Sequence, residues 1–353
     1  MKAKPKSQPA LGIDAVMNGP MKATEIRSLA ANLMSGDRRA LARAITLVES
    51  TRPDHRETAN RLLHEISDHT GGAIRVGISG APGVGKSSFI ETFGNHVLEQ
   101  GHKVAVLAVD PSSPRTGGSI LGDKTRMETL ARNPATFIRP SPSGGTLGGL
   151  ARRTREAMLI CEAAGFDLVI VETVGAGQSE AAVADLVDVF LLLLTPAGGD
   201  QLQGLKKGIV ELADILVVNK ADGELARPAK QTQAEYAGAL SLLAKQTEIW
   251  SPPVLLASAL EGSGIGDIWE TIGDYRAAHS GPDGIAAKRA VQAKTWMWRA
   301  IEENLIGQIR GDPRAKDRIA TLEERVISSD ISPSAAADEV LAHFNLWKSE
   351  AGS

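Results

Sequence analysis

The chain has 353 residues, enough for one large domain or two modest ones, and its 39 Lys and Arg against 42 Asp and Glu give a net charge of −3. This near balance argues against a nucleic-acid partner and against a disordered acidic chain. The single cysteine, Cys161, cannot form an internal disulfide, which favours the cytoplasm, and the longest apolar run, Val189–Leu194, is too short to span a bilayer. No apolar region follows the basic start at Lys2, Lys4 and Lys6, so we expect no secretory signal.

Residues 1–73 form the first predicted segment, a polar tail followed by two helices. Apolar residues recur there at intervals of three and four, around Leu41–Val48 and around Leu62–Ile66. From 74 to 280, short β-branched runs alternate with helical stretches: 74–78, 104–109, 136–138, 168–171, 189–194, 215–218 and 254–256. This alternation predicts an α/β fold, a mostly parallel sheet with helices on both faces and ligands at the carboxyl ends of its strands.

Residues 281–353 lack the strand pattern and are predicted to be helical. Val291, Trp298, Ile301, Leu305 and Ile309 share one helical stripe, and Asp312-Pro313 and Ser332-Pro333 each supply the start of a further helix. All five Trp and both Tyr lie at or after Tyr236. Three of the tryptophans fall in this segment, where large rings are favoured either at an interface or in ordinary packing: Trp296, Trp298 and Trp347.

A glycine-rich sequence follows the first strand run and precedes a helical stretch from Ser88 to Gln100. It matches G-x-x-x-x-G-K-[ST] in full, in the strand-loop-helix context that this phosphate-binding motif requires. Its backbone N–H groups surround phosphate oxygens, its lysine reaches the β- and γ-phosphates, and its hydroxyl ligates Mg²⁺. We therefore predict a nucleotide-phosphate site at Gly80, Ala81, Pro82, Gly83, Val84, Gly85, Lys86, Ser87 and Ser88.

Carboxylates at the ends of other strands can hold the metal of such a site, directly or through water. Glu172 ends the fourth strand run, where many P-loop enzymes carry Asp, and Gly175 would offer its backbone N–H to the γ-phosphate. Asp110 ends the second run and opens a long polar loop that reaches Asp123. The predicted catalytic residues are Lys86, Asp110 and Glu172, and the predicted Mg²⁺ residues are Ser87, Asp110, Asp123 and Glu172.

Two elements select the base. Asn219-Lys220-Ala221-Asp222 follows the sixth strand run and fits N-K-x-D, the guanine-recognition pattern. A carboxylate at Asp222 can accept hydrogen bonds from N1–H and the exocyclic amine of guanine, whereas adenine presents an acceptor at N1. After the last strand run, Ser258, Ala259 and Leu260 resemble the short element whose backbone contacts the guanine oxygen. GTP and GDP are therefore the predicted nucleotides.

Together these residues resemble the MeaB/ArgK family, GTPase chaperones of adenosylcobalamin-dependent methylmalonyl-CoA mutase. The stretches that carry the resemblance are 77–88, 108–113, 171–180 and 196–203, and the likeness runs from about residue 35 to beyond 300. It implies a P-loop NTPase (G) domain at 74–280, an N-terminal helical extension within 1–73 and a C-terminal helical dimerisation arm at 281–353. It also implies a homodimer and Mg²⁺ held by the four residues already named.

The resemblance further implies three segments that respond to nucleotide: 111–123, 175–180 and Pro196–Lys207. The third would contact the mutase, whose cofactor loading the family gates and which it protects from inactivation. Gly175 is followed by Ala176, and Gln178 lies three positions on, so the glutamine that follows this glycine in Ras-type enzymes is absent. We therefore expect slow hydrolysis until a partner reorganises the loops and Asp110 or a neighbour orients the attacking water.

Three alternatives remain open from the sequence. A metallocentre-assembly GTPase of the hydrogenase or urease accessory type would need Cys/His clusters, but the seven histidines are scattered and Cys161 lies within a helical pattern. A kinase of a periplasmic transport protein, a role attached to the ArgK name, would need a phosphoacceptor-recognition motif that we do not find. A nucleotide-dependent scaffold without turnover is opposed only by the predicted metal carboxylates.

Overall fold

The computed structural model describes residues 21–109, 127–140, 147–173, 179–196, 207–243 and 249–344. The chain divides into two compact units, residues 1–289 and 290–353. The elements up to the last strand are α1 (Ala23–Met34), α2 (Arg38–Glu49), α3 (Pro53–Glu65), η2 (Ser67–His69), β1 (Ile74–Gly80), α4 (Lys86–Glu99), β2 (Val104–Val109), α6 (Glu128–Arg132), β3 (Thr136–Pro140), α7 (Leu147–Ala163), β4 (Leu168–Thr173), α8 (Ser179–Ala184), β5 (Val189–Leu194), α10 (Lys207–Val210), β6 (Ile215–Val218), η3 (Gly223–Leu225), α11 (Ala226–Leu243) and β7 (Val254–Leu256). They are followed by α12 (Ile265–Ala278), α13 (Ile285–Gly311), α14 (Pro313–Ile327) and α15 (Pro333–His343).

The described strands form one parallel sheet of seven, in the order β3-β2-β4-β1-β5-β6-β7. The predicted α/β fold is confirmed, and each predicted strand run lies within a strand. β1 is the middle strand: the chain builds outward on one side through β2 and β3, returns as β4 between β2 and β1, and then crosses β1 to reach β5. Such a change of direction opens a ligand-binding crevice at the carboxyl ends of the strands.

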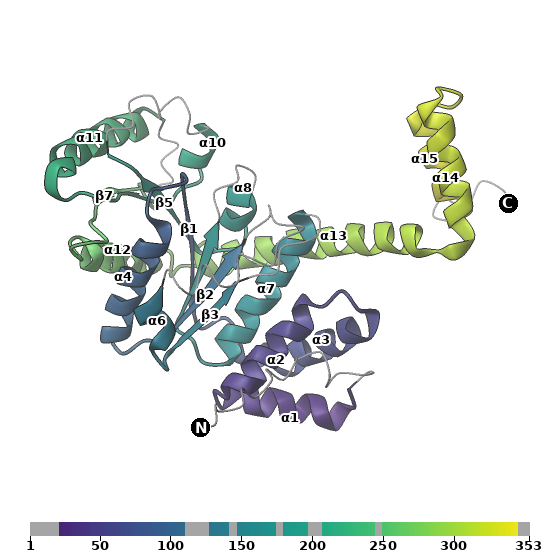
Figure 1. Ribbon diagram of the computed structural model, residues 1–353, viewed down its shortest axis with the longest axis horizontal. Coiled ribbons are helices and arrows are strands. Elements are labelled where there is room, and N and C mark those ends of the chain that lie inside the picture. Colours follow the sequence, from purple (N-terminus) through teal and green to yellow (C-terminus); the bar gives the residue numbers. More distant parts are fainter. Residues whose placement is uncertain are drawn as a thin grey trace, which may run out of the picture. The chain divides into compact units, whose positions relative to one another are not determined.

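Helices cover both faces of the sheet, as predicted (Figure 1). On one face, apolar side chains of α4, α6 and α12 pack on the strands, with Phe89, Phe93 and Ile268 fully buried. On the other face α8 packs against β1, β4 and β5, and α7 against β2 and β4. Gly77 of β1 allows this close approach, because a Cβ there would lie 3.0 Å from side-chain atoms of both Val183 and Val187.

Between residues 21 and 73, the described part of the N-terminal segment, the structure has three α-helices, so the expectation of two was wrong. The additional helix, α1, buries Ile26, Leu29, Ala30 and Leu33, which have the same spacing of three and four as the helices that were predicted. Its first turn directly follows the polar tail. α2 packs on α7, and the Arg139 guanidinium at the end of β3 pairs with the buried carboxylate of Glu49.

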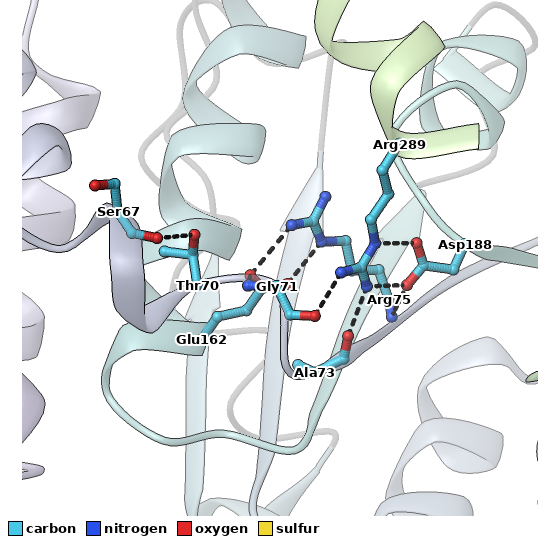
Figure 2. A network of polar contacts seen from close by, with 8 residues as sticks. All are labelled: Ser67, Thr70, Gly71, Ala73, Arg75, Glu162, Asp188 and Arg289. Carbon is cyan, nitrogen blue, oxygen red and sulfur yellow. Dashed lines mark hydrogen bonds and ion pairs between the residues drawn. The ribbon is translucent and has the colours of Figure 1, made fainter. Parts of the chain in front are cut away.

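A buried polar network fixes the first turn of α13 at the amino edge of the sheet (Figure 2). The guanidinium of Arg289 donates to both oxygens of the fully buried Asp188, at 2.7 and 2.6 Å, and to the carbonyls of Gly71 and Ala73 at 2.7 Å. Asp188 also accepts from the backbone N–H of Arg75 on β1 at 2.8 Å, and the Arg75 guanidinium pairs with Glu162 of α7. The start of α13 is therefore joined to β1 and to the turn before β5.

The second unit consists of the rest of α13 with α14 and α15. α14 and α15 pack together around Ala315, Leu322 and Ala336, and Ser332 caps α15 by accepting from the Ala335 N–H at 3.2 Å, as predicted. On α13 the predicted apolar stripe is largely exposed: Val291 67%, Trp298 55%, Ile301 38% and Leu305 40%. Among the described residues, no helix is both long and apolar enough to cross a bilayer.

Candidate nucleotide site

The phosphate loop begins where β1 ends, at the centre of the sheet. Gly80 lies so close to β5 that a Cβ there would be 2.6 Å from the Leu193 carbonyl oxygen, so only glycine fits. Gly85 has φ 93° and immediately precedes α4, a left-handed conformation that glycine adopts without strain. The N-terminus of a long helix therefore points its free N–H groups at the loop, the arrangement that binds phosphate.

Asn219 and Lys220, from the loop after β6, attach the base-recognition segment to the phosphate loop. The buried Asn219 donates from Nδ2 to the Val84 carbonyl at 2.9 Å and accepts from the Ala259 N–H at 3.2 Å. Lys220 Nζ donates to the Gly83 carbonyl at 2.7 Å. A Cβ at position 85 would lie 2.9 Å from Asn219 Nδ2, which gives a second reason for glycine there. Three loops predicted separately from the sequence are thus one structural unit.

Asp222 is oriented by a side chain. The hydroxyl of Ser258, which is fully buried, donates a short hydrogen bond to Asp222 Oδ2 and accepts from the Glu261 N–H at 3.1 Å. Ala259 contacts Asn219 through its backbone, whereas the Leu260 side chain is 86% exposed. The carboxylate therefore stands in a fixed orientation at the carboxyl edge of the sheet, with one oxygen held by the protein.

Ser87 and Glu172 meet at the start of α4. The Ser87 hydroxyl donates to Glu172 Oε1 at 3.3 Å, and Glu172 is buried at the end of β4. A hydroxyl and a carboxylate are hard oxygen donors of the kind that Mg²⁺ prefers. The residues present therefore fit a magnesium ion beside the phosphate loop.

Lys86 lies in the same place. Its ammonium group donates to the carbonyls of Gly80 and Ala81, at 2.7 and 3.2 Å. Burial lowers the pKa of Lys86 below its usual range, and the charges of Glu172 and Glu180 partly offset this effect. The cation is thus half-desolvated and close to two carboxylates, where an anionic ligand would gain strongly from its charge.

The structure brings together most of the residues predicted from the motifs. Within the phosphate loop Val84 is buried, while Pro82, Gly83 and Ser88 are exposed or partly exposed. Asp110, Asp123 and Gly175 lie outside the described residues, as do Trp347 and most of the three segments predicted to respond to nucleotide. Their roles remain predictions.

Two residues near the site were missed. The Thr92 hydroxyl of α4 donates to the Ala259 carbonyl at 2.8 Å and so ties the base segment to the helix that follows the phosphate loop. No local motif marks it. Glu180 in the first turn of α8 is buried and its charge acts on Lys86. Its position in the stretch 171–180 is the one signal that could have indicated it, although the sequence predicts only a loop there.

A phosphate loop after the central strand of a parallel sheet, joined to Asn-Lys-Ala-Asp after β6, defines a P-loop GTPase. The family model described as methylmalonyl Co-A mutase-associated GTPase MeaB matches residues 41–314. The chain belongs to this MeaB family, and it is an enzyme that hydrolyses GTP.

Relatives cover nearly the whole chain. A protein from Caulobacter vibrioides is 54% identical over 324 residues, which span 92% of this chain and 99% of the relative. The mouse protein named methylmalonic aciduria type A homolog, mitochondrial, is 49% identical over 322 residues, 88% of this chain and 78% of the relative. The crystal structure of a protein called LAO/AO transport system kinase matches with a TM-score of 0.72 and 36% identity, covering 92% of this chain and 99% of that one.

Proposed function

We propose that this chain is a Mg²⁺-dependent GTPase that acts as a chaperone of adenosylcobalamin-dependent methylmalonyl-CoA mutase, gating its cofactor loading and protecting it from inactivation. The observation that supports this most strongly is the MeaB family match over residues 41–314, in a chain whose base and phosphate loops form one unit. The name of the mouse relative, a methylmalonic aciduria type A homologue, agrees with this assignment.

Guanine selection follows from Asp222. Its carboxylate, held by Ser258, accepts hydrogen bonds from N1–H and the exocyclic amine of guanine. An adenine ring would place an acceptor against the same oxygens and leave them unpaired, a mismatch that recognition sites reject strongly. Lys220 lies along the base, and Asn219 keeps the base loop at a fixed distance from the phosphate loop.

Hydrolysis uses residues on both sides of the phosphate loop. Lys86 neutralises the β- and γ-phosphates, and Gly175 offers its N–H to the γ-phosphate. Ser87 and Glu172, with Asp110 and Asp123, would hold Mg²⁺, which when bound neutralises charge on the phosphate oxygens. Asp110 or a neighbouring group orients the attacking water once the loops are ordered. Because Ala176 follows Gly175, turnover of the chain alone is slow and a partner stimulates it.

The two proposed partners are assigned to different segments of the chain. Within our proposed division into residues 1–73, 74–280 and 281–353, the last segment forms the homodimer, and the exposed apolar stripe of α13 supports this role. The segment Pro196–Lys207 comes directly after β5 in the chain, and β5 ends at the same edge of the sheet as the nucleotide site. This segment contacts the mutase.

A pull-down with tagged chain is the primary test. We expect recovery of an adenosylcobalamin-dependent acyl-CoA mutase in the presence of GTP and Mg²⁺. Recovery of a transport protein without a mutase would support instead the transport-kinase role after which the structural relative is named. The same preparation should bind GDP tightly and ATP weakly.

Metal titration separates the metallocentre alternative. In the described parts of the chain, no three or more His, Cys, Asp and Glu side chains gather into a metal-binding group. We expect Mg²⁺ to strengthen guanine-nucleotide binding and no stoichiometric uptake of Zn²⁺ or Ni²⁺. Bound nickel would contradict the chaperone assignment.

A further inference from the structure

Two buried hydroxyl groups join the strands that lead into the catalytic loops. Thr173 Oγ1 of β4 donates to Ser79 Oγ of β1 at 2.9 Å, and the two residues are 0% and 1% exposed. β1 and β4 are parallel neighbours with Ile78 opposite Glu172, so Ser79 and Thr173 form the next step of the same ladder. Their bond is the last described side-chain link between these strands before the phosphate loop and residues 174–178 begin.

The hydroxyl pair and the metal residues lie on opposite faces of the sheet. Side chains alternate along a strand, and Ile78 packs in the core beneath α4. Glu172, its ladder partner, reaches Ser87 at the start of that helix. Ser79 and Thr173 therefore face the side covered by α8, directly behind the carboxylate. A contact there can fix the backbone of Glu172 without touching nucleotide or metal.

Net stability alone does not account for two hydroxyls at this place. A hydrogen bond between neutral buried groups contributes little net stability, and a pair of apolar side chains of the same shape is nearly equivalent. The other side chains of β4 up to Val171 are aliphatic, as are Ile74, Val76 and Ile78 of β1. Unlike an aliphatic contact, the hydrogen bond between the two hydroxyls has a preferred distance and angle, so it fixes the register and separation of the two strand ends.

The phosphate loop is already fixed on its other side. Gly80 pairs with Leu193 of β5, and a Cβ at Gly80 would lie 2.6 Å from the Leu193 carbonyl oxygen, so the start of the loop packs closely on that strand. On the β4 side, the hydrogen bond between Thr173 and Ser79 restrains the end of β1 relative to the end of β4. Ser79 adjoins Gly80, whose carbonyl accepts from Lys86, and Thr173 adjoins Glu172, which accepts from Ser87. One bond thus relates both halves of the phosphate and metal site.

We propose that Thr173 and Ser79 are positioning residues, whose hydrogen bond sets the Glu172 carboxylate relative to Ser87 and thereby determines how strongly Mg²⁺ supports nucleotide binding. The inference rests on the magnesium role proposed above for Ser87 and Glu172. Outer-shell partners of metal ligands typically change metal affinity by about 10- to 100-fold when they are removed. A loss at the lower end of this range is expected, since the contact acts through the backbone.

The test compares dissociation constants of a fluorescent non-hydrolysable GTP analogue with Mg²⁺ and with EDTA, and uses their ratio as the readout. Thr173→Val removes the donor and keeps the shape, and Thr173→Ser keeps the hydroxyl. The double variant Ser79→Ala with Thr173→Val removes both hydroxyls of the bond together. Thr136→Val is the matched control, because Thr136 is an equally buried strand threonine at the start of edge strand β3.

We expect Thr173→Val and the double variant to lower the Mg²⁺ ratio about tenfold while binding in EDTA changes less than about twofold. Thr173→Ser should retain most of the parent's Mg²⁺ ratio, and Thr136→Val should leave that ratio unchanged. An unchanged ratio in the double variant, or an equal loss in EDTA, would overturn the inference and leave the magnesium site standing. If the parent chain itself shows no effect of Mg²⁺, the proposed metal role fails and this inference fails with it.

Discussion

Asp222 is the residue on which nucleotide choice depends. Its carboxylate is held by the Ser258 hydroxyl, so the oxygens that meet the base are oriented before a nucleotide arrives. Preorganised polar groups discriminate strongly, because a wrong base leaves them desolvated and unpaired. The same carboxylate gives a test that changes specificity without removing the site.

Asp222→Asn replaces an acceptor with a donor where guanine presents its exocyclic amine. We expect GTP binding to weaken about 100-fold, while xanthosine triphosphate, which carries an oxygen at that position, binds better than to the parent. Competition titrations with guanosine, inosine and xanthosine triphosphates measure this. Glu224→Gln, at an exposed acid two residues on in η3, is the control and should leave the preferences unchanged.

At this scale, contiguous motifs were predictable and long-range contacts were not. Lys86, Ser87, Asn219 and Asp222 were found because their chemistry needs a fixed local spacing. The bond from Ser258 to Asp222 spans 36 residues and the bond from Thr92 to Ala259 spans 167. An isolated serine or threonine in a sequence has no feature that shows its partner, so these supporting residues required the fold.

The first turn of α13 is the element whose attachment is best defined. Arg289 neutralises Asp188, a carboxylate with no solvent exposure, and also satisfies the carbonyls of Gly71 and Ala73 (Figure 2). The helix also places Lys288 Nζ 2.6 Å from the Asp188 carbonyl. Removing one partner of a buried ion pair leaves an uncompensated charge, which is far more costly than the pair was favourable.

Arg289→Met should therefore lower the free energy of unfolding by about 3 kcal/mol. Denaturant titration of the full chain measures the change. Arg276→Met provides the comparison, because Arg276 lies in the last turn of α12 and is exposed, so its loss should change stability by less than about 0.5 kcal/mol. Equal stabilities of the two variants would show that the network does not hold α13.

Because of Tyr275 in α12, we expect the free energy of unfolding to fall as the pH becomes alkaline. Burial raises the pKa of its phenol far above the usual range, and the charge of Asp214 and a hydrogen bond to it add to the effect. Above about pH 10 an unfolded chain loses this proton and the folded chain keeps it, so stability falls as pH rises through that value. Tyr275→Phe should flatten the fall between about pH 9 and 11 in unfolding titrations, and an unchanged slope would contradict this.

The sequence predicted the elements whose apolar residues form continuous or regularly spaced runs, and it missed α1, which follows a polar segment. The aliphatic runs of β2, β4, β5 and β6 are buried on both faces, and their continuous apolar sequence made them recognisable, as did the half-buried run of β7. α1 was overlooked because its apolar spacing follows directly on a polar tail. The anchoring of α13 was not foreseen either, since Arg289 and Asp188 lie 101 residues apart and a lone charged residue suggests a solvated surface.

At the scale of the whole molecule, the late position of the Trp and Tyr residues can be related to the roles of its segments. The nucleotide site works through glycines, backbone groups, hydroxyls and carboxylates, while Trp298 lies exposed on the apolar stripe of α13. Trp296, on the same helix, is buried. A run of exposed apolar side chains along one helix is typical of a surface that another chain covers.

Trp298→Glu places a charge in this stripe and should raise the dissociation constant of the proposed homodimer by about tenfold or more. Light scattering after size-exclusion chromatography, over a range of concentrations, gives the masses. Ala293→Glu adds the same charge to an exposed position on another side of α13 and should leave the dimer intact. A parent chain that is monomeric at every concentration would contradict the dimer.

The central claim is that GTP hydrolysis serves a mutase. The most direct measurement is the steady-state rate of GTP hydrolysis by the full chain with Mg²⁺, alone and with an excess of adenosylcobalamin-dependent methylmalonyl-CoA mutase. We predict a slow rate alone and a rise of about tenfold or more with the mutase, since the chain has Ala176 where Ras-type enzymes have their water-orienting glutamine. A fast rate alone, or a rate that the mutase leaves unchanged, would contradict it.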